Sequence, residues 1–418
     1  MTIEQFSNAS LIVAWILYTL SFFTFVITIT GKKWGHGKPE QFEQKWKRRS
    51  IAITIAGLIA QISFFITRWI YAGHIPTSNM FEFLTFLTMM ITAAFIVVFF
   101  IYKSAVIGVF AMPLIVLFLS YAAVFPWEAK PLVPSLNSHW LKIHVTTAAA
   151  GEAFFAIGFA AGLMYLIRTI NFQDKSKSGR RQVRWLEITL FVVLCMFGFV
   201  IMTFGFGAAN YEAVFEQEVL DESGEEPQRV TNTVTYTLPP IFKPHNSEVI
   251  SMDSFIGMKQ PLFETPSWMQ GVNSGRKLNT FIWSVIGGLV LYGLFRLILR
   301  KPIGAAIQPV LKDIKADDLD EISYRAISIG FPLFSLGALV FAMIWAQQAW
   351  GRFWGWDPKE VWALITWLFY SAYLHLRLSR GWHGIKSSWL AVIGFVIVLI
   401  TLIFVNLVIA GLHSYAGV

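Results

Sequence analysis

Long apolar runs recur along this chain and restrict it to very few folds. Each run is close to the roughly 20 residues that an α-helix needs to cross the ~30 Å hydrocarbon layer of a bilayer. Hydrophobic residues make up 56% of the chain and charged residues only 14%, so a water-soluble domain could not cover this apolar surface. A helix satisfies its own backbone hydrogen bonds in lipid. The sequence therefore predicts an all-α polytopic membrane protein.

About ten transmembrane helices are predicted, near residues 9–30, 50–71, 80–102, 104–125, 143–167, 185–207, 279–299, 326–346, 360–379 and 387–411. With the N-terminus outside, 23 of the 33 lysine and arginine residues fall on the cytoplasmic side. Basic residues accumulate on that side of membrane proteins. This distribution places both termini in the extracytoplasmic space, and it accounts for the net charge of +8 without a nucleic-acid partner.

The hydropathy pattern divides the chain into four parts. N-terminal transmembrane helices occupy 1–75, a transmembrane bundle 76–170, an inserted helix pair 171–316, and a core with the last three helices 317–418. The inserted part holds the one long segment outside the membrane, about 208–277, which is predicted to be extracytoplasmic. It begins acidic and becomes strand-like in "RVTNTVTYTLPP". A small folded insertion and a loosely ordered loop both fit this pattern.

Tryptophan is concentrated in "AWGRFWGWDPKEVW", residues 349–362, on the predicted outer surface. Indole faces can lie against a planar ligand, and tryptophan also forms the ordinary aromatic belt at membrane interfaces. A belt spreads its tryptophans over many helix ends, whereas this motif is compact and contains acidic residues. The pair Asp357-Pro358 is typical of an N-cap and first turn of a helix. The motif consists of Trp350, Gly351, Trp354, Trp356, Asp357, Pro358, Glu360 and Trp362.

Two histidines are predicted at the same outer interface as this motif. His144 lies where the fifth span begins, in "SHWLKIHV", and His413 lies where the tenth span ends, in "GLHSYAGV". Two neutral imidazoles from separate helices, with an aromatic surface between them, are what bis-axial ligation of haem iron requires. The alternative is that both histidines only extend to the interface beside an aromatic belt. The residues favour a haem site with both histidines as iron ligands.

Other polar groups are predicted within the spans. His375 lies about 22 Å below the outer end of the ninth span at 1.5 Å per residue, either as a functional intramembrane histidine or as a structural one near two arginines. Glu82, with Asn79 before it, and Glu152 are candidates for hydrogen bonds to a ligand histidine or an indole N–H. For Glu152 the alternative is a hydrogen bond between helices of the bundle. The single cysteine, Cys195, excludes an internal disulfide and a CxxC or CxxCH motif in this chain.

The segment "WGRFWGWDPKEVWALITW" resembles the haem-handling membrane proteins with a tryptophan-rich WWD domain, and most closely the CcsA/ResC branch of the System II cytochrome c biogenesis machinery. The branch is indicated by "SNMFEFLTFL", "SHWLKIHV", "YRAISIGFPLFSLGALVFAMIWA", "YLHLR" and "GLHSYAG". The resemblance covers about 76–90, 137–165 and 317–418. No family motif is recognised in the first span or in about 171–316, so the helix pair there is expected to be a departure from the compact family pattern.

The resemblance implies that His144 and His413 are the external haem ligands, and that the tryptophan-rich motif binds the porphyrin. It implies that His375 belongs to a transit site for haem b, whose second histidine comes from a CcsB/ResB-like partner. Haem b would be a transported substrate, presented outside the membrane for thioether attachment to the CxxCH motif of apocytochrome c. A thiol-reducing thioredoxin-like protein is a further implied partner.

The chain is thus expected to be the haem-handling component of a holocytochrome c synthase rather than an enzyme alone. The implied location is a bacterial cytoplasmic membrane or a thylakoid-type membrane, with the WWD loop on the extracytoplasmic side. Two alternatives stay open. One is a haem exporter without a role in ligation, and the other is a membrane redox subunit with permanently bound haem. The latter usually needs histidines paired across the bilayer, and only His375 lies deep.

Overall fold

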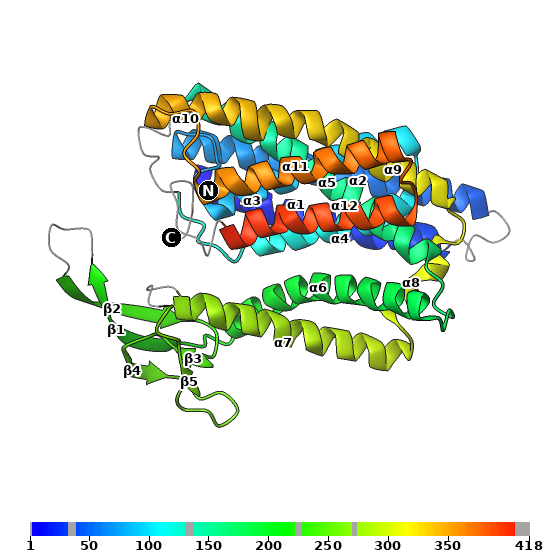
Figure 1. The fold of residues 1–418 in the computed structure, drawn as a ribbon. Coiled ribbons are helices and arrows are strands. Elements are labelled where there is room, and N and C mark those ends of the chain that lie inside the picture. The colour runs from blue at the N-terminus through cyan, green and yellow to red at the C-terminus, as the bar shows by residue number, and fades with distance from the viewer. Residues whose placement is uncertain (1, 32–38, 130–137, 222–227, 270–273, 406–418) are drawn as a thin grey trace. The chain divides into compact units, whose positions relative to one another are not determined.

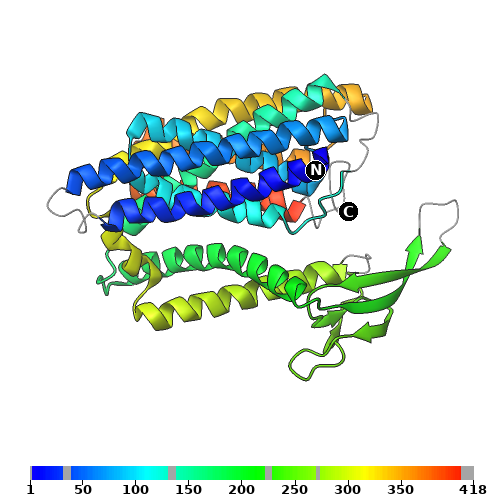
Figure 2. The ribbon, with the colours of Figure 1, turned by 180° about the vertical axis from the view of Figure 1, so that it is seen from behind.

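The computed structural model describes residues 2–31, 39–129, 138–221, 228–269 and 274–405. The chain forms two compact units: unit 1 comprises Met1–Val183 with Ile307–Val418, and unit 2 comprises Arg184–Ala306. Unit 1 is a bundle of long helices that lie alongside one another (Figures 1 and 2). Unit 2 contains a helix pair and all the described strands. The four-part division expected from the hydropathy pattern stays a prediction.

Unit 1 begins with five long helices, of which α1 and α2 pack along each other. After an interval that includes unit 2, the chain returns through a short 3-10 turn and continues as α9, a π-helical segment and α10, without a break in the helix. The helices and turns are α1 (Ile3–Thr30), α2 (Pro39–Ala72), α3 (Met80–Tyr102), α4 (Ala105–Ala122), α5 (His139–Thr169), η3 (Gln308–Leu311), α9 (Ala316–Phe334), η4 (Ser335–Phe341), α10 (Ala342–Trp350), α11 (Pro358–Arg380), α12 (Ile385–Leu399) and η5 (Ile400–Val405).

Helix α5 is at the centre of unit 1 and packs against α3, α9 and α12. Its approach to α9 is close because glycines face each other. A Cβ on Gly151 would lie 2.6 Å from the backbone nitrogen of Phe334, and one on Gly330 would lie 2.8 Å from the carbonyl oxygen of Gly151. Small residues let two helix backbones approach in this way within a membrane. The close packing fixes the position of every residue that α5 contributes to the site described below.

Helices occupy all ten predicted spans, and the described part of the last one ends at Val405. Nine helices of the described residues are long and apolar enough to cross a membrane, which confirms the all-α polytopic class. Helix α11 is not among the nine, although its 23 residues extend about 35 Å. The side of the membrane on which each terminus lies stays a prediction.

Helix α11 is less apolar because the face that it buries is polar. All its buried residues are hydroxyl-bearing or charged and recur every three or four positions, namely Thr366, Tyr370, Tyr373 and Arg377. At the end of this stripe Arg377 donates to Asp320 of α9 at 2.8 Å and to Ser387 of α12 at 2.9 Å. A buried charge is retained at low cost only when it is paired in this way. Helix α11 is therefore bound to its neighbours by polar contacts inside the bundle.

Unit 2 consists of two long helices joined by a β-subdomain. Its elements are α6 (Lys177–Ala208, which begins in unit 1), β1 (Ala213–Asp221), β2 (Gln228–Tyr236), β3 (Phe242–Lys243), β4 (Ser247–Met252), β5 (Phe263–Glu264), α7 (Ser274–Leu299) and α8 (Ile303–Ile307). Strands β2, β1 and β4 form an antiparallel sheet in that order, and β3 pairs with β5 in parallel. The strand expected in "RVTNTVTYTLPP" is confirmed as β2.

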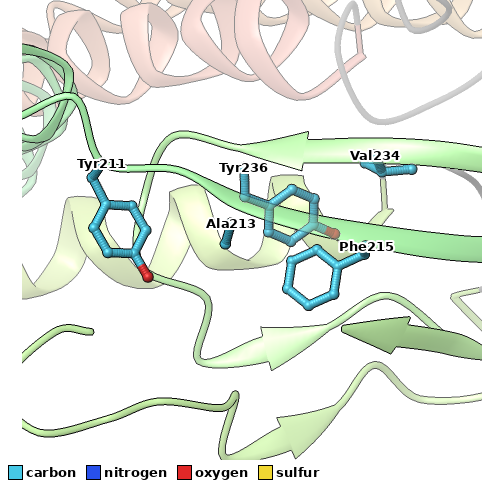
Figure 3. Close-up of a cluster of buried hydrophobic side chains, with 5 residues drawn as sticks. All are labelled: Tyr211, Ala213, Phe215, Val234 and Tyr236. Carbon is cyan, nitrogen blue, oxygen red and sulfur yellow. The ribbon is translucent and has the colours of Figure 1, made fainter. Parts of the chain in front are cut away.

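One face of the three-stranded sheet carries a small apolar core, made of Tyr211, Ala213, Phe215, Val234 and Tyr236 (Figure 3). These residues alternate along β1 and β2, as side chains on one face of a sheet must. Phe206 of α6 and Phe255 also pack against this core. The predicted outer segment is thus a folded subdomain over its described residues, rather than a loosely ordered loop.

Candidate functional site

His144 is the predicted external iron ligand that the structure describes, and its ring is held in one orientation. It lies in the second turn of α5, half-buried, with Nδ1 2.8 Å from the carbonyl oxygen of Gly337. A carbonyl oxygen only accepts, so Nδ1 carries the proton and donates. In a neutral imidazole this leaves Nε2 with the free lone pair. Histidines that bind metals are commonly oriented by such a backbone hydrogen bond.

The carbonyl of Gly337 that accepts from His144 lies in a π-helical segment. Segment η4 (Ser335–Phe341) is a π-helix, in which each N–H donates to the carbonyl five residues earlier. The N–H of Ala342 donates to the Gly337 carbonyl in this way. Single π-helical turns are rare and are frequently found at functional sites. Residue 337 must also be small, because a Cβ there would collide with the backbone of Ala148 in α5. The local helix geometry therefore serves to orient His144.

A series of aromatic rings leads from His144 to the tryptophan-rich motif. The imidazole lies parallel to Trp345, with ring centroids 5.7 Å apart and planes inclined by 10°. Trp345 in turn meets Trp350 at 4.8 Å and 63°. Trp345 is buried, with 3% of its surface exposed, so the first indole of the motif is connected to the histidine through a fixed ring.

The polar residues of the motif shape its backbone. Gly351 ends α10 in the left-handed region at φ 69°, a conformation that costs glycine nothing. Asp357 caps α11 by accepting from the N–H of Lys359 at 3.1 Å. Glu360 accepts from the N–H groups of Gly355 at 2.7 Å and Asp357 at 3.2 Å. The expected N-cap at Asp357, followed by Pro358 in the first turn, is confirmed.

The turn presents indoles rather than burying them. Trp354 and Trp356 meet edge to face, with centroids 6.0 Å apart at 86°. Trp356 is 71% exposed and has φ 57°, a left-handed conformation that costs a non-glycine residue on the order of 1–2 kcal/mol. An exposed indole in a costly conformation gains nothing in water. The arrangement is suited to a flat apolar ligand that covers the ring.

A lysine lies at the start of α11, and a carboxylate lies further along α5 from His144. The ammonium of Lys359 sits 5.7 Å from the centroid of the Phe83 ring and interacts electrostatically with both His144 and Glu152. Glu152 is eight residues beyond His144 on α5, about 12 Å along the axis, too far for the predicted hydrogen bond between them. Its buried Oε2 has no hydrogen-bond partner among the described residues.

Glu82 has different partners from the predicted ones. Its Oε1 accepts from Nε of Arg68 at 2.9 Å, and both side chains are almost fully buried. Its Oε2 accepts from the N–H and hydroxyl of Ser78 at 2.9 and 2.7 Å. Asn79 caps α3 through the N–H of Glu82. Within the described residues Glu82 and Asn79 thus brace the start of α3, with neither a histidine nor a tryptophan among their partners.

The structure does not bring His375 to this place. His375 lies on the exposed side of α11, away from the polar stripe that the helix buries. His413 lies outside the described residues, so its distance from His144 stays a prediction. Over the part of the chain that is described, no three histidine, cysteine or acidic residues form a group that could hold a metal ion. A bis-histidine haem site would need only two such residues.

Comparison with known proteins matches two blocks of the chain, 77–219 and 281–413, to the model of the family described as cytochrome C assembly protein. The chain belongs to the cytochrome c assembly family. Cytochrome c biogenesis protein CcsA of Crocosphaera subtropica is 31% identical over 83% of this chain and 82% of its own length. The protein of the same name from Nostoc punctiforme is 32% identical over the same shares, and that from Picosynechococcus is 30% identical.

The family match corrects one expectation from the sequence. Helix α6 and α7 from Phe281 onward fall within the matched blocks, so the helix pair at 185–207 and 279–299 is not a departure from the family pattern. Between the two matched blocks only 220–280 is unmatched, and this stretch includes β2 to β5. Membership of the cytochrome c assembly family supports a role in cytochrome c maturation, and the multi-pass membrane architecture agrees with it.

Three residues of the site were not singled out from the sequence. Gly337 and Trp345 both lie in the stretch "FSLGALVFAMIWA", and Lys359 lies within the tryptophan-rich motif itself. Trp345 carries a signal, because it falls five residues before Trp350 at the end of the same span. Gly337 carries none, since its role depends on a π-helical turn that no residue pattern predicts.

Proposed function

We propose that the chain binds haem b between His144 and His413 at the extracytoplasmic face and presents it for thioether attachment to apocytochrome c. The observation that carries the proposal is the orientation of His144. Its Nδ1 proton is committed to the Gly337 carbonyl, which leaves Nε2 as the donor that haem iron requires. This donor set fits haem as a transported substrate. Membership of the cytochrome c assembly family supports the same reading.

The tryptophan-rich motif would supply the rest of the site. Exposed Trp356 and half-buried Trp354 offer apolar surfaces for the porphyrin, while the cation of Lys359 offers a counter-charge for a propionate. Ligation by histidine must be exchangeable, because the CxxCH histidine of the apocytochrome has to take one axial position. A thiol of the CxxCH motif then adds across each haem vinyl group, with sulfur bonded to one carbon and hydrogen to the other.

His375 would serve the passage of haem through the membrane. Its position on the exposed side of α11 leaves it accessible to a neighbouring protein, so the second ligand would come from a CcsB/ResB-like partner. The chain is then one component of a holocytochrome c synthase. The WWD loop would lie on the extracytoplasmic side of a bacterial cytoplasmic or thylakoid-type membrane.

The experiment expresses the chain with its partner and an apocytochrome c, and compares His144→Ala with His139→Ala. His139 is exposed at the start of the same helix and is not a predicted ligand, so it controls for loss of a histidine there. We expect His144→Ala to lose copurified haem and covalent cytochrome c, and His139→Ala to keep both. Equal haem and equal cytochrome in the two variants would refute the proposal.

The same co-expression system distinguishes a role in haem attachment from a role in haem export. If deleting the chain abolishes thioether-linked cytochrome c while free haem still reaches the outer face, attachment is its role. If external haem disappears with the deletion, and haem added from outside restores attachment without this chain, the exporter reading holds. Haem that stays bound through turnover would instead indicate a redox subunit.

A further inference from the structure

The segment between β4 and α7 exposes large apolar side chains. We refer to its four most exposed apolar residues as the loop patch: Ile256 (89% exposed) and Leu262 (64%) before β5, Phe263 (59%) in β5, and Trp268 (80%) after it. Single apolar residues on a surface are ordinary, whereas several in one short segment indicate an interaction surface. None of these residues belongs to the proposed haem site.

The tip of the loop has a conformation that suits isoleucine poorly. Phe255 and Met258 close a tight hairpin with backbone hydrogen bonds of 3.0 and 2.8 Å. The two residues between them, Ile256 and Gly257, have φ 47° and 81°. Such a turn favours asparagine, aspartate or glycine, and a β-branched residue with positive φ is a genuine outlier. The chain thus exposes an isoleucine where both backbone and solvation in water oppose it.

The hairpin packs on α7 close to the end at which the apolar span of that helix begins. Phe255, beside the tip, packs edge to face on Trp283 with centroids 5.4 Å apart. A span of about 20 residues that ends at Leu299 begins near Thr280, so Trp283 lies about one turn inside the apolar part of α7 (Ser274–Leu299). The base of the hairpin is therefore level with the boundary of the hydrocarbon layer on the sheet side.

Lipid is the occupant that this position indicates. In both views the loop between β4 and β5 lies beside the sheet end of α7 (Figures 1 and 2). Near the same end, α7 itself exposes Phe281 (66% exposed), an apolar side chain on a helix that is long and apolar enough to cross a membrane. Lys259, exposed between Ile256 and Leu262, can extend its ammonium to the headgroups while its neighbours enter the apolar layer.

We propose that the loop patch inserts into the bilayer leaflet on the sheet side and anchors the β-subdomain to the membrane surface. Burial in lipid removes the solvation cost of the four side chains. Insertion also explains why a tight turn carries isoleucine instead of a polar residue. The anchored loop would hold the β-subdomain at a fixed height beside its two helices.

The test places an environment-sensitive fluorophore on a single cysteine in the full chain, purified into lipid nanodiscs without any partner. Cys195 is the one native cysteine and is first replaced by serine. Ile256→Cys is compared with Thr233→Cys, an exposed site on β2. We expect a blue-shifted emission and several-fold stronger quenching by nitroxide lipids at position 256, and quenching by aqueous iodide at position 233.

A second pair of variants tests insertion with the label at a position other than 256. The label is placed at Leu262, with Ile256 either kept or replaced by asparagine, which accepts the tip conformation. Quenching by nitroxide lipids at position 262 should fall when Ile256→Asn removes the apolar tip. If both loop labels are quenched by iodide and not by nitroxide lipids, the loop lies in water and the proposal is wrong. Protection that appears only after a partner protein is added would also overturn it.

Discussion

Replacing Glu82 should unfold unit 1 more easily while leaving the chemistry of the haem site unchanged. Arg68 and Glu82 form an ion pair of 2.9 Å, with 1% and 0% of their side chains exposed. Removing one partner of a buried pair leaves an uncompensated charge and costs about 3–5 kcal/mol. We therefore expect Glu82→Ala to lower the free energy of unfolding by ~3–5 kcal/mol. Glu82→Gln should be intermediate, because its amide oxygen still accepts from Ser78.

The assay is denaturant-induced unfolding in detergent, followed by helical circular dichroism, together with haem content per folded protein. The double variant Arg68→Met with Glu82→Met is the matched control. It removes both charges, so it should recover most of the stability that either single change loses. If Glu82→Ala unfolds like the wild type but binds less haem, Glu82 acts at the haem site and our account of its role is wrong.

Three further results are expected. Asp357→Ala removes the cap of α11 and should cost about 1 kcal/mol, seen as faster hydrogen exchange at the start of that helix, whereas Asp357→Asn should keep most protection. Trp345→Leu removes the ring beside His144. Because an aromatic pair contributes ~0.5–1.5 kcal/mol, haem binding should weaken roughly 2- to 13-fold in a haem titration. Unchanged binding would show that the ring does not position the ligand. The pKa of Glu264 is lowered from 4.5, mainly by the N–H of Asn246, so its contribution to stability is present above pH 4.5 and is lost as pH falls through the lower folded value. Hydrogen exchange between β3 and β5 should accelerate over that range, and Glu264→Gln should abolish this pH dependence.

Much of the helical framework follows from the sequence because lipid permits few alternatives. A run of apolar residues between charged loops must be a helix, so α3 begins and ends where its span was predicted. The start of α11 was also predictable, because Asp357 and Pro358 have local roles that any helix N-terminus requires. Hydropathy does not detect the polar face of α11, since that face depends on which neighbours the helix meets.

The orientation of the site depends on contacts between distant parts of the chain. His144 and Gly337 are 193 residues apart, and their hydrogen bond joins α5 to the π-helical segment η4. Likewise, the sequence predicted that Glu82 orients a ligand, whereas the structure pairs it with Arg68 of the preceding helix. Pairing of β1 with β4 has the same origin, because strand partners are set by packing over a shared core.

The most direct test of the central claim replaces His144 by glycine in the purified complex and records the absorption and electron paramagnetic resonance spectra of bound haem. We expect the low-spin bis-histidine signal to be lost in His144→Gly and to return when imidazole is added to fill the space. His139→Gly, at an exposed position of the same helix, should keep the native spectrum throughout. A native low-spin spectrum in His144→Gly, unaffected by imidazole, would show that this histidine is not the iron ligand.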